Sequence, residues 1–172
     1  MDASRPSGLR FAGFVLAVAG AALIGYGAVQ TWVTVGIRSV QTDSDTEIVG
    51  IDLADGTVAL ACALVLLIAV LATRVIRARG LRMTLGGIAI AAAAIAVASA
   101  GAFLQNGIER AIVVGAIGIP RNQWEELEVF REYGLGPYLV LAGGVLGFFA
   151  GVLTLAWAHR LQPAPAPGDP RG

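Results

Sequence analysis

The chain has 172 residues, of which 56% are hydrophobic and only 14% are charged. Soluble domains carry about 25% charged residues, so this composition excludes an ordinary soluble domain and indicates membrane spans. Twelve basic residues balance twelve acidic residues, which leaves no net positive charge for binding nucleic acid, and the single cysteine, Cys62, excludes an intramolecular disulfide and a cysteine-based metal cluster.

Four uncharged runs of 18 residues or more predict four transmembrane helices, at residues 11–32, 56–73, 83–104 and 135–157. About 20 residues at about 1.5 Å each cross a hydrocarbon core of about 30 Å. The first run is longer than the apolar part of a signal peptide, about 7–15 residues, so we expect a retained helix, with cleavage as the alternative. The predicted fold class is an all-α integral membrane protein. A four-transmembrane-helix bundle over residues 11–158 would follow a short cytoplasmic N-terminus, residues 1–10.

The first outer loop, residues 33–55, contains two β-like pieces, Thr31–Val40 and Thr46–Leu53, separated by Gln41–Asp45. Their β-branched residues and the Asp/Ser cluster between them predict a β-hairpin in a small extracytoplasmic cap. The loop has five acidic residues whose carboxylates could bind calcium: Asp43, Asp45, Glu47, Asp52 and Asp55. An EF-hand loop needs glycine at its sixth position and glutamate at its twelfth, where this chain has Ile48 and Ala54. We therefore expect a solvated acidic loop and no metal site, with a weak divalent-ion site as the alternative.

The hinge at residues 74–82 contains four arginines: Arg74, Arg77, Arg79 and Arg82. A polar segment between two spans must emerge from the lipid, and contact with anionic headgroups accounts for its charge without nucleic acid. With four spans, the side that holds the hinge and both termini has eight arginines and the other side has four. This positive-inside bias predicts a plasma-membrane protein with cytoplasmic N- and C-termini. Trp32 and Trp157, at the ends of the first and last spans, are predicted to be membrane-interface anchors.

The second outer loop, residues 105–134, contains Asn122-Gln-Trp-Glu125, which fits a helix N-cap followed by glutamate at the third position. Trp124, Leu127 and Phe130 recur at every third residue and would give such a helix an apolar edge. The pattern predicts a short helix over residues 122–133. After the last span, the proline-rich residues 159–172 predict an extended, disordered cytoplasmic tail.

Small residues form two stripes at a spacing of four, as in a glycine zipper. One consists of Gly143, Gly147 and Gly151 in the last span, and the other of Gly13, Ala17, Ala21 and Gly25 in the first. Missing side chains let two helix backbones approach closely. The stripes therefore predict either helix packing inside one bundle or an interface with a partner or a second copy.

Three segments carry a resemblance to a known family: Trp32-Val-Thr-Val, Val49-Gly-Ile-Asp-Leu53 and Gly134-Leu-Gly-Pro-Tyr-Leu-Val-Leu-Ala-Gly-Gly144. Together they resemble the tryptophan-operon-associated transmembrane proteins of actinobacteria, and the similarity extends over most of the four-helix frame. The resemblance implies a bacterial plasma-membrane protein with four spans and undefined biochemistry. It supplies no catalytic residues.

No catalytic or phosphate-binding motif occurs in the sequence, and no charged residue lies at the centre of a span. We therefore expect no enzymatic activity and no cofactor. The predicted function is that of an accessory, scaffold or interaction subunit, whose partners are the lipid bilayer and either another membrane protein or a second copy. A small homo-oligomeric transporter or channel subunit for an apolar solute is the first alternative. An extracytoplasmic ligand sensor is the second.

Overall fold

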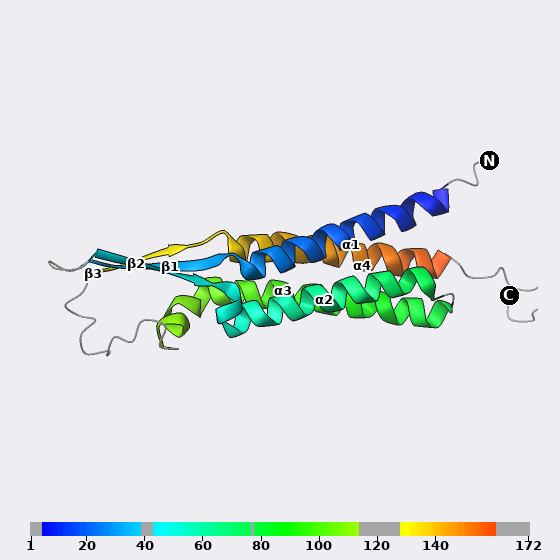
Figure 1. The fold of residues 1–172 in the computed structure, drawn as a ribbon. Helices are drawn as coiled ribbons and strands as arrows, with labels where there is room; N and C mark the ends of the chain where they lie inside the picture. The colour runs from blue at the N-terminus through cyan, green and yellow to red at the C-terminus, as the bar shows by residue number, and fades with distance from the viewer. Residues whose placement is uncertain (1–4, 39–42, 77, 114–127, 161–172) are drawn as a thin grey trace, which may run out of the picture.

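The computed structural model describes residues 5–38, 43–76, 78–113 and 128–160. In these ranges the chain forms four long helices and three strands (Figure 1). The helices are α1 (Arg5–Val29), α2 (Ala54–Val75), α3 (Arg79–Val113) and α4 (Gly136–Arg160). The strands are β1 (Thr31–Arg38), β2 (Asp43–Val49) and β3 (Glu128–Tyr133), and a 3-10 turn, η1 (Gly50–Asp52), precedes α2.

Each long helix contains a segment long and apolar enough to cross a membrane. These segments are Gly8–Val29, Ala54–Val75, Arg79–Asn106 and Gly136–His159. The predicted fold class, a four-transmembrane-helix bundle, is confirmed, and a small three-stranded sheet stands where a β-hairpin and a short helix were predicted.

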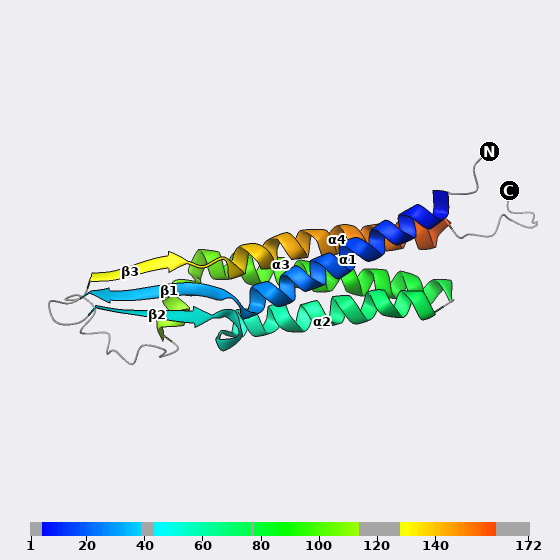
Figure 2. The ribbon, with the colours of Figure 1, turned by 45° about the horizontal axis from the view of Figure 1, so that its top comes forward.

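The helices lie side by side, and each packs against two others. α1 contacts α2 and α4, and α3 contacts α2 and α4, with the most extensive contact between α1 and α4. The start of α1, the end of α4 and the α2–α3 turn lie at one end of the bundle, which we call the terminal end (Figure 1). The three strands extend beyond the opposite end, which we call the sheet end (Figures 1 and 2).

Alanine supplies most of the buried side chains between the helices. On α3 these are Ala89, Ala92, Ala93, Ala96 and Ala100, each at most 5% exposed. Large aliphatic and aromatic side chains instead face outward, such as Ile68 and Phe149, which are 65% and 55% exposed. Because lipid tails are as apolar as leucine, helices in a membrane associate through close packing of small residues. The distribution of side-chain size therefore fits a bundle surrounded by lipid.

The strands form one antiparallel sheet in the order β2-β1-β3. The hairpin predicted in the first outer loop corresponds to β1 and β2. The second of these strands begins at Asp43, inside the segment predicted to be a turn, and residues 39–42 lie outside the described residues. Between Thr31 and Val33 the register with β2 shifts, so that Trp32 is an extra residue on β1. In a regular strand, neighbouring side chains point to opposite faces of the sheet, and a bulge lets two neighbours depart from this rule.

The prediction of a short helix over residues 122–133 is wrong for residues 128–133, which form strand β3. Residues 122–127 lie outside the described residues. β3 pairs with β1 from Glu128 opposite Arg38 to Tyr133 opposite Val33. The free edge of β1 offers backbone hydrogen-bond partners to a segment with valine, phenylalanine and tyrosine, which favour strands. Pairing with the distant strand β1 therefore outweighs the local repeat of apolar residues at every third position.

The arginine hinge is also shorter than predicted. Arg74 lies in the last turn of α2, and Arg79 and Arg82 lie in the first turn of α3, while Arg77 is outside the described residues. The Arg82 Nε–H donates a hydrogen bond to the Ile76 carbonyl oxygen at 2.6 Å. α3 continues to Val113, nine residues past the predicted end of the span at residue 104. The N-terminal residues 1–4 and the predicted disordered tail from residue 161 onward are outside the described residues.

Candidate functional site

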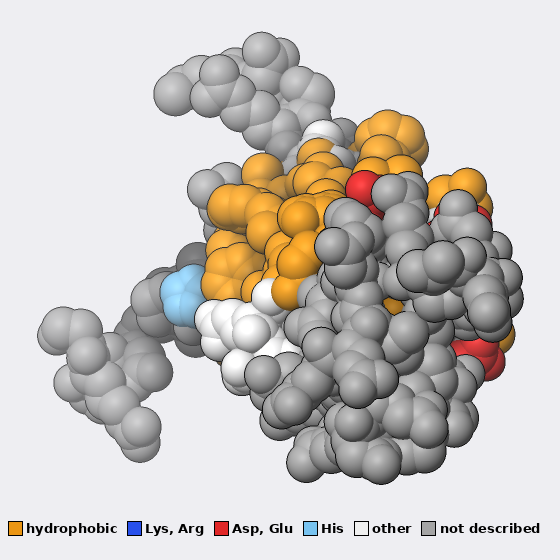
Figure 3. All heavy atoms as spheres, turned by 90° about the vertical axis from the view of Figure 1, so that its left-hand side faces the viewer, with side chains coloured by type: hydrophobic (Ala, Val, Ile, Leu, Met, Phe, Trp, Pro, Cys, Tyr) orange, Lys and Arg blue, Asp and Glu red, His pale blue; other side chains and the backbone are white. Residues whose placement is uncertain are grey.

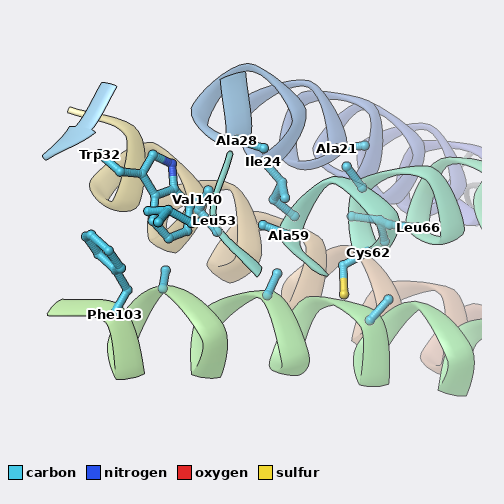
Figure 4. Packing of buried hydrophobic residues seen from close by; sticks show 14 of the residues in the cluster. Ala21, Ile24, Ala28, Trp32, Leu53, Ala59, Cys62, Leu66, Phe103 and Val140 are labelled. Atoms are coloured by element: carbon cyan, nitrogen blue, oxygen red, sulfur yellow. The ribbon is translucent and has the colours of Figure 1, made fainter. Parts of the chain in front are cut away.

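Trp32 lies at the point where the sheet meets the bundle, and its side chain is 0% exposed. Because of the bulge, both Trp32 and its neighbour Val33 are fully buried. Phe103 points toward the indole from α3, and the two rings meet edge to face with centroids 4.8 Å apart (Figure 4). Val140 of α4 and Leu53 lie beside them in the same buried cluster (Figure 4). We call the surroundings of Trp32 the tryptophan junction.

The indole also closes the C-terminal end of α1. The last carbonyl groups of a helix have no partner within it, and other donors must satisfy them. The Trp32 Nε1–H donates a buried hydrogen bond to the Gly27 carbonyl oxygen at 2.8 Å, and the Gln30 amide donates to the same oxygen at 3.3 Å. The first strand is thereby fixed directly to the helix that precedes it.

Two glycines make room for the indole. A Cβ atom on either Gly50, in η1, or Gly136, at the start of α4, would overlap the Trp32 ring. Only glycine lets the backbone come this close to the ring at these two positions. The start of α4 and the turn before α2 therefore both rest against the same side chain.

Backbone hydrogen bonds join the same segments. The Gly50 amide donates to the Gln30 carbonyl oxygen at 3.0 Å, and the Gly134 amide donates to the Trp32 carbonyl oxygen at 3.0 Å. A Cβ atom on Gly134 would overlap the Thr31 carbonyl group. The three segments that carry the family resemblance thus meet around Trp32. Gly50, Gly134 and Gly136 are the residues in the sequence that signal this close packing.

Tyr133 attaches the third strand to α3. Its ring meets Phe103 edge to face at a centroid distance of 6.3 Å, and its hydroxyl donates to the Leu104 carbonyl oxygen at 2.9 Å. The Ser99 hydroxyl of the same helix donates to the Asp55 carbonyl oxygen in the first turn of α2 at 2.9 Å. The sheet, α2 and α3 are therefore joined through contacts on one stretch of α3, from Ser99 to Leu104.

The structure corrects the role predicted for Trp32. A membrane-interface anchor needs its indole at the lipid headgroups, whereas this indole is enclosed by protein. Trp157, the second predicted anchor, is 9% exposed, and the guanidinium groups of Arg10 and Arg82 approach its ring at 5.2 and 4.7 Å from the centroid. Both tryptophans pack within the protein, one at each end of the bundle.

The predicted stripes of small residues face inward. A Cβ atom on Gly143 would lie 2.6 Å from the Gly20 carbonyl oxygen, so the backbones of α1 and α4 are almost in contact there. Gly20 belongs to neither predicted stripe. Towards the terminal end, a Cβ atom on Gly13 would lie 3.4 Å from Leu153 Cβ of α4. The α1–α4 contact therefore depends on glycine from both helices.

The other members of the stripes also contact neighbouring helices: Gly147 faces Leu66 of α2, Gly151 faces Ile90 of α3, and Gly25 faces Ala63 of α2. Ala17 and Ala21 are 0% and 6% exposed. This placement favours packing inside one bundle over an exposed docking surface for these residues.

Charges divide between the two ends of the molecule. The described acidic residues lie at the sheet end, in strands β2 and β3, in η1, in the first turn of α2 and near the end of α3. Figure 3, which views the molecule from the sheet end, shows several of them. In the described ranges, no three His, Cys, Asp or Glu side chains come together as metal ligands would. At the terminal end lie the arginines near the start of α1, at the end of α2 and in the first turn of α3, and the Arg74 guanidinium lies over the Phe14 ring at 4.0 Å from the centroid.

Comparison with known families agrees with these features. The family model for the tryptophan-associated transmembrane protein matches residues 14–166, which include all three segments of the tryptophan junction. No curated protein matches the chain. The matched region covers most of the sequence, and the chain belongs to the tryptophan-associated transmembrane protein family.

Proposed function

We propose that this protein is an accessory or scaffold subunit of the membrane, which binds a partner protein through its sheet and has no catalytic activity of its own. One observation carries the proposal: a small sheet projects beyond the bundle and is fixed to it at the tryptophan junction (Figure 2). A surface held in one geometry loses little conformational freedom when a partner binds.

The edges of this sheet offer a means of binding. β1 lies between β2 and β3, and in the described part of the chain no further strand pairs with the outer edge of β2 or of β3. Such edges present backbone N–H and C=O groups that an extended segment of another protein can pair with. Exposed acidic side chains at Asp45 and Glu132 would select a partner that is not itself acidic there.

We further propose that the protein lies in the plasma membrane with the terminal end in the cytoplasm. The arginines at the α2–α3 turn and near both termini support this orientation through the positive-inside rule. The sheet would then face the outside of the cell, where its partner would be another membrane protein or a second copy.

Site-specific photo-crosslinking in intact membranes tests the proposed function. Crosslinkers replace Asp45 on β2 and Glu132 on β3, and a matched control replaces Ile68, which faces outward from α2. We expect a discrete protein adduct from one or both strand positions and only lipid adducts from position 68. Absence of protein adducts from both strands, or solute flux in proteoliposomes that contain this protein alone, would argue against an accessory role.

A further inference from the structure

A small cavity opens at the terminal end between α1, α2 and α4. Its lining includes Arg10 and Phe14 of α1, Thr73 and Arg74 of α2, and Thr154 and Trp157 of α4. The free volume is about 20 Å³, enough to hold one water molecule. A cavity of this size admits a single oxygen atom of a larger group whose remainder stays at the mouth.

The two arginines of the cavity are held by aromatic rings. The Arg74 guanidinium lies over Phe14, and the Arg10 guanidinium lies over Trp157. Cation–π contacts orient a guanidinium and leave its N–H groups available at its edge. Arg10 and Arg74 therefore present hydrogen-bond donors at one cavity without a large loss of side-chain freedom on binding.

These cations have no anionic partner within the described ranges. The acidic residues described there lie in the strands, in η1, in the first turn of α2 and near the end of α3, all at the opposite end of the bundle. The hydroxyl groups of Thr73 and Thr154 donate to carbonyl oxygens of their own helices, Val70 and Ala150. Among the described residues, the cavity therefore carries positive charge alone, which would attract an anion.

The position of the cavity favours a lipid as the source of that anion. Arg10, Arg74 and Trp157 lie within two residues of the ends of three membrane-spanning segments. Leu9, Val70 and Leu153 line the same cavity and add apolar surface beside the charges. Basic pockets between transmembrane helices at the membrane surface suit anionic headgroups.

We propose that this cavity binds the phosphate group of an anionic phospholipid. One phosphate oxygen enters the cavity and accepts hydrogen bonds from Arg10 and Arg74, and the acyl chains lie along the outer surface of the bundle. The site is separate from the proposed partner-binding sheet, and neither proposal depends on the other.

Native mass spectrometry of the full chain in detergent tests the site, with phosphatidylglycerol and phosphatidylcholine of the same chain length as probes. We expect the unmodified protein to retain phosphatidylglycerol in preference to phosphatidylcholine. Arg10→Gln and Arg74→Gln should each weaken phosphatidylglycerol binding about fivefold, from the typical contribution of one arginine near an anionic surface. Arg74→Lys should weaken it less, because lysine keeps the charge but loses the paired donors of the guanidinium group.

Arg79→Gln is the control for general contact between the hinge arginines and headgroups, because it removes the same charge at the same end from a residue outside the described cavity lining. It should leave phosphatidylglycerol binding within twofold of the unmodified protein. An equal loss in Arg79→Gln and Arg74→Gln would replace the proposed site by a diffuse effect of charge. Equal binding of the two lipids would overturn the proposal, and displacement of the lipid by inorganic phosphate would assign the cavity to a soluble anion instead. Circular dichroism of each variant separates loss of binding from loss of folding.

Discussion

A single tryptophan side chain joins the two structural parts of this molecule. Trp32 is the extra residue of a β-bulge, caps the last turn of α1 through Gly27, and packs edge to face on Phe103. Burying a large aromatic ring removes much apolar surface from water or lipid, and a buried N–H needs an acceptor. Trp32 meets both conditions, so its contribution is to packing and helix capping.

Replacing Trp32 by alanine should therefore lower the free energy of unfolding by about 3–5 kcal/mol, as for other fully buried aromatic residues. Trp32→Phe should cost less, about 1–3 kcal/mol, because the ring is largely kept and the Gly27 carbonyl loses its indole donor. Unfolding by SDS in mixed micelles, followed by circular dichroism, measures both. Phe149→Ala serves as the control, since its ring is 55% exposed, and a loss as large as that of Trp32→Ala would contradict the packing argument.

Glycine at position 143 is required by the contact between α1 and α4. A Cβ atom there would lie 2.6 Å from the Gly20 carbonyl oxygen, and backbone atoms cannot move aside as a flexible side chain can. Gly143→Ala should destabilise the protein by about 1–3 kcal/mol, as other overpacked sites do.

Gly87→Ala in α3 is the matched control for this prediction. Apart from the adjoining residues of its own helix, no atom lies within 4 Å of a Cβ built at Gly87, so the change should be neutral or stabilise by up to about 1 kcal/mol through helix propensity. The same unfolding assay in mixed micelles compares the two variants. Equal destabilisation by both would show that glycine is required for a reason other than the α1–α4 contact.

At the scale of the elements, β1 organises the sheet because it is the only one of the three described strands with a neighbour on each side. β2 follows it along the chain, whereas β3 comes from a segment about 90 residues later. Local sequence predicted the hairpin through its β-branched residues. It could not predict β3, since the hydrogen-bond partners of that strand lie on β1.

Hydrogen exchange should separate these strands. Amides of β1 point to partners on both sides, so we expect β1 to exchange more slowly than β2 and β3, which are paired on one side only. Exchange followed by mass spectrometry in detergent or nanodiscs measures this order. Exchange in β1 as fast as in an unstructured peptide would contradict the sheet. Slow exchange in β1 with fast exchange throughout residues 128–133 would contradict the pairing with β3.

At the scale of the whole molecule, the charges are sorted along the bundle axis. Most of the described arginines lie at the terminal end, whereas the described acidic residues lie at the sheet end. An arginine-rich side is retained in the cytoplasm during insertion, whereas acidic residues contribute little to orientation. This asymmetry is the basis for the orientation that we propose.

Labelling with a membrane-impermeant maleimide tests that orientation. Cysteine is placed either at Ala78, exposed in the α2–α3 turn, or at Asp45, exposed on β2, after Cys62 has been replaced by alanine. In intact cells we expect labelling at position 45, and at position 78 only after the membrane is permeabilised. Labelling of position 78 from outside, with position 45 protected, would reverse the orientation.

The four spans can be read from the amino-acid sequence, because a run of uncharged residues long enough to cross a bilayer is stable there as a helix. The positions of the arginines and small residues can be read in the same way, since they are features of composition and spacing along one segment. The order in which the helices pack, the strand at residues 128–133 and the burial of Trp32 instead depend on contacts between distant segments. Each of these depends on a partner from a distant segment: the edge of β1 for β3, and Phe103, Gly50 and Gly136 for the indole. The spacing of residues along the chain does not indicate which distant segment will pack against them.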